Sequence, residues 1–164
     1  MSSDTGAFRY SNATADTYKK AGMLLSLGID HARISHLLYF SKSEAQIRAE
    51  GLASENLKVA HNGRTAYSHV TERELSDNSL GLSDFDTAID IVRSLIGVEI
   101  AVFLKEVRPG EFKVSLRSTG ADVSLIAKKF GGGGHIRAAG CTVSGATAED
   151  AISAILFEIE KIYQ

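Results

Sequence analysis

The chain has 164 residues, of which 44% are hydrophobic and 23% charged, a composition typical of a globular protein with a buried core. Its 18 basic and 20 acidic residues give a net charge of −2. A protein that grips a long duplex usually carries a basic excess, because contacts to phosphates dominate that affinity. The composition therefore favours a local contact with a short ligand over binding of a long polymer.

Cys141 is the single cysteine, so the chain contains no internal disulfide and no paired-cysteine metal site. Its apolar surroundings, residues 138–143, predict a small buried hydrophobic side chain. No apolar run reaches membrane-spanning length, and the N-terminal residues do not resemble a signal peptide. We expect a cytoplasmic protein that does not contact the membrane.

Residues 1–56 are predicted to form a mainly helical segment with short connections. Thr14 and Asp30 each have the character of a helix cap before an apolar stretch of helical period. Ser41 and Glu44 have the spacing of a capping box, which predicts a third helix ending near residue 52.

Residues 57–164 are predicted to form a domain in which strands alternate with helices. Asn62-Gly63 and Pro109-Gly110 are turn signatures, so each joins two strands in a hairpin. The expected strands are 58–60, 65–71, 98–107, 112–118 and 141–143. The expected fold class is α/β with a mixed sheet.

Helices are expected between these strands, and the polar residues 76–83 are expected to form a loop. Ser83 and Asp86 have capping-box spacing before a helix that would place Val92 and Ile96 on one apolar face. A short helix is expected at 121–130. Thr147 and Asp150 have the same capping spacing before a final packing helix.

The run Gly131-Gly132-Gly133-Gly134-His135 is the sharpest candidate site. Four glycines cost backbone entropy, so a domain retains them where the backbone approaches something closely or needs a positive φ. Free amides in such a loop can form an anion site, and a helical turn over 135–139 would add N-terminal donors. His135 would then donate a hydrogen bond to a phosphate oxygen. A plain flexible connector between a helix and a strand is the alternative.

Arg117 and Ser118 end a predicted strand shortly before the glycine run. A guanidinium suits a phosphate, and ligands of open α/β sheets lie beyond strand ends. Arg117 is alternatively a solvated surface residue, and Ser118 either contributes its hydroxyl to the site or caps the next helix. Asp4, in Asp4-Thr5-Gly6, is a candidate oxygen ligand of Mg²⁺ or Mn²⁺, although a simple turn is the default interpretation.

The glycine–histidine run, followed by Ala138-Ala139-Gly140 and preceded by 114–118, resembles the DHH-associated C-terminal domain of the DHH phosphoesterases. The branch of nanoRNases and adenosine bisphosphate phosphatases is the most similar, and cyclic-dinucleotide phosphodiesterases are related to it. The string 4–12 resembles the last acidic motif of the catalytic domain of that family. The two matches lie in the family's order and, with the helices between them, cover nearly the whole chain.

This resemblance implies a substrate-binding domain at 57–164 and the end of a catalytic DHH domain at 1–56. It implies that Asp4 is a ligand of a metal pair, usually manganese, and that Arg117, Ser118, 131–134 and His135 hold the phosphate or nucleotide of the substrate. The earlier acidic motifs and the Asp-His-His string of the family are absent. We therefore expect a C-terminal fragment that binds no metal stably and is inactive without its N-terminal catalytic domain.

The implied activity is hydrolysis of short oligoribonucleotides, nucleotide bisphosphates or related cyclic dinucleotides. An exopolyphosphatase or pyrophosphatase of the same family is one alternative. A stand-alone module for single-stranded nucleic acid is another, and a domain that only joins chains is a third. The sequence leaves open whether two copies form a homodimer.

Overall fold

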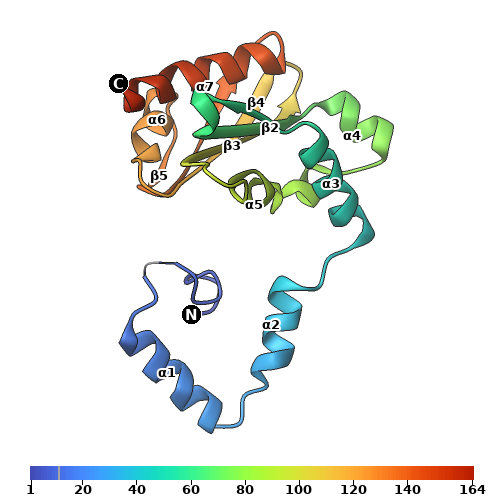
Figure 1. Ribbon diagram of the computed structural model, residues 1–164. Coiled ribbons are helices and arrows are strands. Elements are labelled where there is room, and N and C mark those ends of the chain that lie inside the picture. The colour runs from blue at the N-terminus through green and yellow to red at the C-terminus, as the bar shows by residue number, and fades with distance from the viewer. Residues whose placement is uncertain (11) are drawn as a thin grey trace. The chain divides into compact units, whose positions relative to one another are not determined.

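The computed structural model describes residues 1–10 and 12–164, which divide into two compact units, Met1–Ser43 and Glu44–Gln164 (Figure 1). The second unit starts earlier than the boundary at 56/57 expected from the sequence. The reason is helix α3 (Glu44–Glu55), which buries Ala49 and Ala53 in the core of that unit. Among the described helices, none is long and apolar enough to cross a membrane.

The first unit contains helices α1 (Ala15–Ser26) and α2 (His31–Tyr39), and both expected caps are confirmed. The Thr14 hydroxyl accepts a hydrogen bond from the Thr17 amide at 3.3 Å, and the Asp30 carboxylate accepts one from the Arg33 amide at 2.9 Å. The third expected cap is wrong. Helix α3 starts only at Glu44, and the Ser41 hydroxyl donates instead to the His36 carbonyl at the end of α2.

The second unit is built on one six-stranded sheet with the strand order β1-β2-β3-β4-β6-β5. Strands β2 and β3 are parallel, whereas every other neighbouring pair is antiparallel, so the expected mixed α/β sheet is confirmed. The strands are β1 (Lys58–Ala60), β2 (Thr65–Val70), β3 (Ile100–Arg108), β4 (Glu111–Ser118), β5 (Gly133–His135) and β6 (Ala138–Ser144).

Both expected hairpins form. Strands β1 and β2 pair across a 3₁₀ turn at His61–Gly63, in which Asn62 has φ 57°. Strands β3 and β4 pair across Pro109-Gly110, and Gly110 has φ 74°, as the third position of a type II turn requires. Local turn chemistry was therefore sufficient to locate both connections.

The helices between the strands differ from expectation in two places. Helix α4 (Glu72–Asn78) occupies the start of the expected loop, and its capping box of Thr71 and Glu74 was overlooked. The expected box of Ser83 and Asp86 is wrong, because Asp84 accepts from the Gly81 amide and opens a 3₁₀ turn (Leu82–Phe85) instead. The remaining helices are α5 (Ala88–Arg93), α6 (Val123–Lys129) and α7 (Ala148–Tyr163), and α7 has the expected cap of Thr147 and Asp150.

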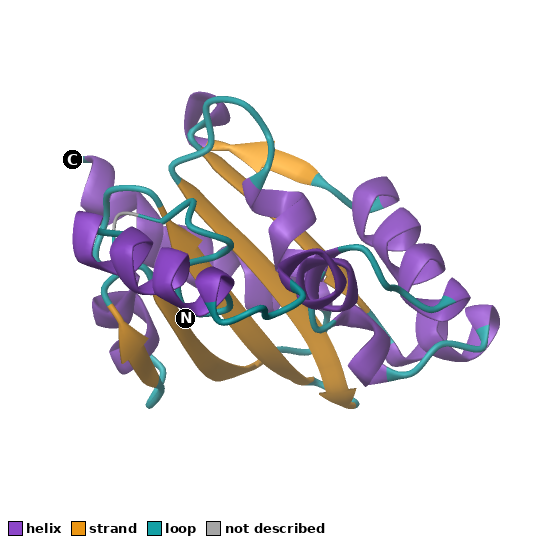
Figure 2. Ribbon diagram, turned by 90° about the horizontal axis from the view of Figure 1, so that it is seen from below, coloured by secondary structure: helices purple, strands orange, loops and turns teal. Residues whose placement is uncertain are grey.

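Helices cover the two faces of the sheet unequally (Figure 2). Helices α6 and α7 pack on one face, where Phe112, Val114 and Leu116 of β4 join Ala139, Cys141 and Val143 of β6 in a single core. Helices α3 and α5 pack on the other face, but the core that they form takes its strand residues from β2 and β3 only. In the described part of the second unit, no helix forms a core on the second face of β4, β6 and β5, and this surface is termed the open face.

Candidate functional site

The open face brings two of the expected site residues into one row across three strands. Arg117 on β4 pairs with Ala138 on β6, which pairs with His135 on β5. Directly paired residues of antiparallel strands project their side chains to the same face, and Leu116 and Ala139 beside them face the core. Arg117 and His135 therefore flank the small side chain of Ala138 on the open face.

The neighbouring rows continue this pattern along the strands. Ser115 pairs with Gly140, which pairs with Gly133, and Lys113 pairs with Thr142. The floor of the open face is thus made of small residues, with Lys113 and Arg117 on one side and His135 on the other. Within these three described rows there is no acidic side chain, so the local charge favours an anion.

The expected helical turn over 135–139 is wrong. Residues 133–135 form an edge strand, and Ile136-Arg137 is the two-residue turn of a hairpin into β6. The turn is anchored from outside, because its Ile136 and Arg137 carbonyls accept from the Val123 and Ser118 amides at 2.9 and 3.1 Å. Residues 135–139 therefore do not supply the N-terminal helix donors that were expected to bind an anion.

The amides at the start of the run already donate hydrogen bonds to backbone carbonyls of α6. The Gly131 amide donates to the Lys128 carbonyl at 3.1 Å, and the Gly132 amide donates to the Ala127 carbonyl at 2.9 Å, which together end α6. An anion nest needs free amides. The Gly131 and Gly132 amides are therefore not available to an anion.

Close backbone packing explains why Gly132 and Gly134 are glycines. A Cβ on Gly132 would lie 2.2 Å from the Gly140 carbonyl oxygen, and one on Gly134 would lie 2.6 Å from that of Ala138. Gly133 is different, because a Cβ there would meet nothing within 4 Å and its φ is not positive. The fold does not require glycine at 133, and an added methyl group would project over the open face.

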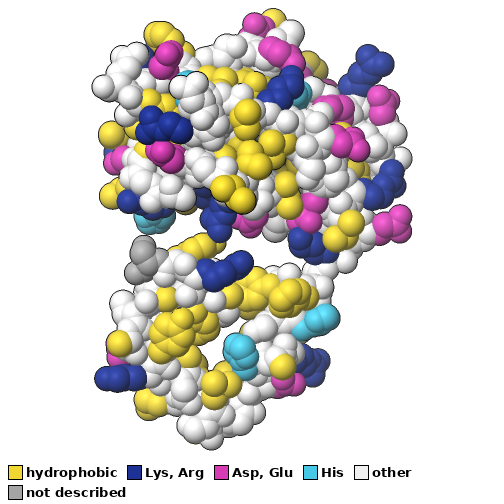
Figure 3. Space-filling view, in the orientation of Figure 1, with side chains coloured by type: hydrophobic (Ala, Val, Ile, Leu, Met, Phe, Trp, Pro, Cys, Tyr) yellow, Lys and Arg dark blue, Asp and Glu magenta, His cyan; other side chains and the backbone are white. Residues whose placement is uncertain are grey.

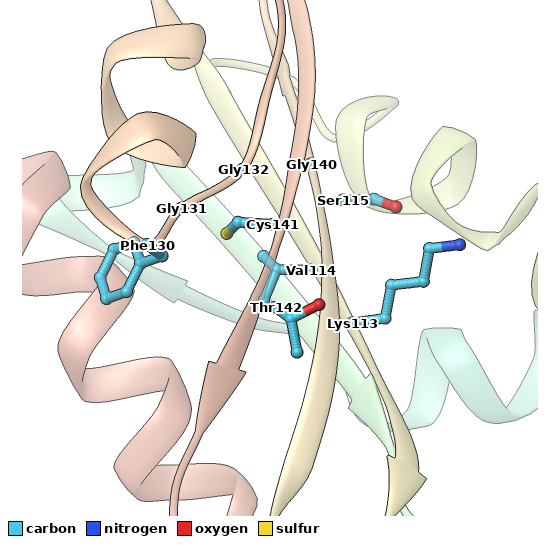
Figure 4. Close-up of a pocket in the computed structure, with 9 residues that line it drawn as sticks. All are labelled: Lys113, Val114, Ser115, Phe130, Gly131, Gly132, Gly140, Cys141 and Thr142. Atoms are coloured by element: carbon cyan, nitrogen blue, oxygen red, sulfur yellow. The ribbon is translucent and has the colours of Figure 1, made fainter.

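A pocket of about 340 Å³ lies beside this hairpin, at the free edge of β6 below the short strand β5 (Figure 4). Phe130 and Cys141 lie on its core side, whereas Lys113 and Ser115 point to the opposite side of the sheet. Gly131 and Gly132 line the pocket. The other expected site residues, Arg117, Ser118, Gly133, Gly134 and His135, are not part of its lining.

Arg117 and Ser118 are both half-buried at the end of β4. Arg117 donates from Nη1 to the Leu116 carbonyl at 3.0 Å, which leaves other guanidinium donors for a ligand. The Ser118 hydroxyl donates to the Ala121 carbonyl and is not the cap of α6, since Asp122 accepts from the Ser124 amide in that role. The expected capping role of Ser118 is therefore wrong, and its role in the site stays a prediction.

Two basic residues near the site were not singled out from the sequence. Lys113 is exposed, and the alternating pattern of β4 already placed it on the face of Arg117. Arg137 is exposed in the hairpin turn, where its Nη1 lies 3.4 Å from the Ala121 carbonyl oxygen. Arg137 is only two residues from His135, so its proximity to the glycine run could have been inferred from the sequence.

Cys141 is buried, as expected, with its side chain in the core under α6 and α7. Burial raises the pKa of its thiol to about 11, so the thiol stays protonated at neutral pH. A protonated thiol is a poor nucleophile and a poor metal ligand. Its position in the pocket wall is therefore a packing position.

Asp4 lies in a tight turn of the first unit. The Thr5 hydroxyl accepts from the Phe8 amide at 3.1 Å, and Gly6, Ala7 and Phe8 have φ between 54° and 63°. The Asp4 side chain is 83% exposed at the outside of this turn. Ser11, which belongs to the string that resembles an acidic motif, lies outside the described residues.

The described residues do not form a metal centre by themselves. Among them there is no group of three or more His, Cys, Asp or Glu side chains that could hold a metal ion. Mn²⁺ and Mg²⁺ favour about six oxygen ligands, and one exposed carboxylate supplies too few of them. The residues present therefore do not fit a resident metal.

Comparisons with known proteins agree with the fold. Residues 67–163 match the model of the DHHA1 domain, which covers more than half of the chain. The chain therefore belongs to the DHHA1 family, the C-terminal DHH-associated domain of DHH-family phosphoesterases.

Two curated relatives are both named bifunctional oligoribonuclease and PAP phosphatase NrnA. The protein of Thermus thermophilus is 31% identical over 154 residues, which are 93% of this chain and 45% of that protein. The protein of Bacillus subtilis is 27% identical over 140 residues, which are 85% of this chain and 44% of that protein. The chain thus spans about half the length of the curated relatives that it matches.

Solved structures give the same picture of the fold. An exopolyphosphatase-related protein from Bacteroides fragilis superposes with a TM-score of 0.89 at 32% identity, over 98% of this chain and 47% of that chain. A pGpG-specific phosphodiesterase from Vibrio superposes with a TM-score of 0.53 at 14% identity, over 96% of this chain and 48% of that chain. The second likeness concerns the fold alone.

Proposed function

We propose that this chain is the substrate-binding part of a metal-dependent phosphoesterase that hydrolyses short oligoribonucleotides, nucleotide bisphosphates or related cyclic dinucleotides. The row of Arg117, Ala138 and His135 carries the proposal, with Lys113 on the same face. Basic side chains around a floor of small residues suit a compact anion such as a phosphate group. The relatives are named for activity on oligoribonucleotides and PAP, and this supports the substrate class.

The proposed role of the open face is to hold and orient phosphate. Arg117 offers a planar fork of donors, and Lys113 offers a point charge. His135, exposed on the edge strand, donates a hydrogen bond to the phosphate. A metal pair, when bound, would supply an activated water, and we propose that its ligands other than Asp4 belong to the half of the relatives that this chain does not span.

Binding of a 5′-phosphorylated adenine dinucleotide to the chain tests this proposal by calorimetry. Replacement of His135 or Arg117 by alanine removes a charge-assisted contact worth about 1.5–3 kcal/mol, so we expect the Kd to rise roughly 10- to 100-fold in each variant. Arg73→Ala is the matched control. Its guanidinium is exposed, but it lies on α4 and pairs with Asp77, so the Kd should stay unchanged.

Equal affinity in the wild type, His135→Ala and Arg117→Ala would contradict the proposal. Affinity that grows with strand length and falls steeply with salt would favour a module for single-stranded nucleic acid. Tighter binding of pyrophosphate or polyphosphate than of the dinucleotide would favour the polyphosphatase alternative, which the printed name of the Bacteroides fragilis protein also suggests.

The first unit supports a proposal about the partner of the chain. Helices α1 and α2 bury none of their residues, although both carry large apolar side chains. The exposed ones include Met23, Leu24, Leu25, Leu27, Ile34, Leu37, Leu38 and Phe40. Apolar exposure on this scale marks an interaction surface. We propose that it packs against the half of the relatives that this chain does not span, and that this half is an N-terminal catalytic domain.

Limited trypsin digestion tests the partner proposal. A helix of 9 to 12 residues without buried contacts is marginal in water. We expect rapid cleavage at Lys19, Lys20 and Arg33, while residues 44–164 resist. A polypeptide that includes the N-terminal half should protect the same three sites at least tenfold in rate. If both units of the chain alone resist trypsin equally, the first unit is stable by itself and the proposal is wrong.

A further inference from the structure

The turn between α5 and β3 presents two apolar side chains to solvent at the edge of the open face. The sequence predicts that Ile96 continues the buried stripe of α5, but the helix ends at Arg93. Leu95 is 40% exposed and Ile96 is 97% exposed. Burial of an isoleucine contributes about 1.5–3 kcal/mol, and the fold gains almost none of it here.

The register of the strands places this turn beside the row of Arg117 and His135. Strand β3 begins at Ile100, which pairs with Ser118, and Ala101 pairs with Arg117. The turn therefore lies at the same end of the strands as the row of Arg117 and His135. It comes from α5, and Val98 after it is buried with the residues of α3 and α5. Since α5 also contacts β4, the turn borders the open face and not the face of α7 (Figure 1).

The turn is held in place by backbone hydrogen bonds. The Ser94 amide donates to the Ile91 carbonyl at 3.1 Å and the Val98 amide donates to the Leu95 carbonyl at 3.3 Å. Gly97 between them has φ 85°, a conformation that favours glycine. Ile96 is therefore displayed on an ordered turn, which lowers the entropy lost when a ligand packs against it.

The open face itself lacks a surface for a nucleobase. Its described rows contain basic, hydroxyl and small side chains, but no aromatic or large aliphatic one. Phosphate binds to such a surface, whereas the faces of a base need apolar contact. Hydrophobic side chains gather near α5, with Lys, Arg and His side chains along the margin next to β5 (Figure 3). The two kinds of contact that a nucleotide needs thus lie next to each other.

We infer that the turn of Leu95 and Ile96 is the base-binding wall of the site, with Ile96 as the residue that distinguishes nucleotides from base-free phosphates. This inference rests on the proposed function and narrows it. A base packed on Ile96 adds affinity for a nucleotide with its phosphate on Arg117 and His135. Pyrophosphate and polyphosphate, which have no apolar part, gain nothing from such a wall.

Titration of the chain with a 5′-phosphorylated adenine dinucleotide and with ribose 5-phosphate tests the inference. We expect Ile96→Ser to raise the Kd of the dinucleotide roughly tenfold and to leave that of ribose 5-phosphate unchanged. His135→Ala should weaken both ligands. Leu125→Ser is the control, because Leu125 is 57% exposed but lies on α6, which covers the other face of the sheet.

The outcomes separate this inference from the function on which it rests. If His135→Ala weakens both ligands and Ile96→Ser weakens neither, the phosphate site stands and the base wall is wrong. A loss in Ile136→Ser without a loss in Ile96→Ser would move the base to the hairpin turn and would also overturn the inference. A wild-type chain that binds the dinucleotide no more tightly than ribose 5-phosphate would overturn it as well.

Discussion

Gly132→Ala is expected to destabilise the second unit by about 2–3 kcal/mol, the largest loss among single-methyl changes near the site. The added Cβ would lie 2.2 Å from the Gly140 carbonyl oxygen and 2.6 Å from the Cys141 Cα. Both atoms belong to the backbone of β6, which is paired with β4, so they cannot move aside as a flexible side chain would. Urea denaturation followed by circular dichroism would measure the change.

Gly133→Ala is the matched control for this prediction. The two glycines are adjacent, but a Cβ at 133 meets nothing within 4 Å, so the free energy of unfolding should stay within about 0.5 kcal/mol of the wild type. Its methyl group would still project over the open face. We therefore expect weaker dinucleotide binding in a fully folded protein. Equal stability of the two variants would show that the run is a flexible connector.

Ile155→Ala is expected to destabilise the second unit by about 2–5 kcal/mol, because it leaves a cavity in addition to losing buried apolar surface. Ile155 has no exposed surface and packs from α7 into the core that includes β4 and β6. The open face is the reverse side of those same strands. Loss of this packing should therefore lower the thermal midpoint and, at temperatures near it, the dinucleotide affinity.

Phe157→Ala is the control for this prediction, because Phe157 lies on the same helix as Ile155 but is not buried. Phe157 is 63% exposed, so its removal should change the free energy of unfolding by less than about 0.5 kcal/mol. Thermal unfolding of the two variants side by side provides the measurement. A similar loss of stability in both would mean that Ile155 is not the buried anchor that the structure shows.

Hairpins and most helices could be predicted from the sequence because their signals are local. Asn62-Gly63 and Pro109-Gly110 suit particular turn geometries, and Thr14, Asp30 and Thr147 satisfy orphan amides within three residues of themselves. The capping boxes expected at Ser41 and Ser83 failed for the same local reason. A hydroxyl three residues before a carboxylate also occurs outside helix starts. Here Ser41 bonds to the end of α2, and Ser83 lies inside a 3₁₀ turn.

The candidate site could be predicted from the sequence only in part. The residue types of Arg117, Gly131–Gly134 and His135 already indicated phosphate chemistry. The helical turn expected after the glycines was wrong, and the amides of Gly131 and Gly132 end α6, while Gly132 and Gly134 lack a Cβ because the backbone of β6 packs against them. Glycine has little conformational preference of its own, so only its strand partner decides whether a run becomes a loop or an edge strand.

The sequence by itself determined the fold class, the turns and the buried position of Cys141, since these follow from side-chain type and from spacing over a few residues. Only the tertiary structure decided that Arg117 and His135 share one row, that Gly133 is free of packing constraints and that Ile96 is exposed. Strand order and register join residues far apart in the chain. The core packing that selects them depends on the whole sheet and not on any local pattern.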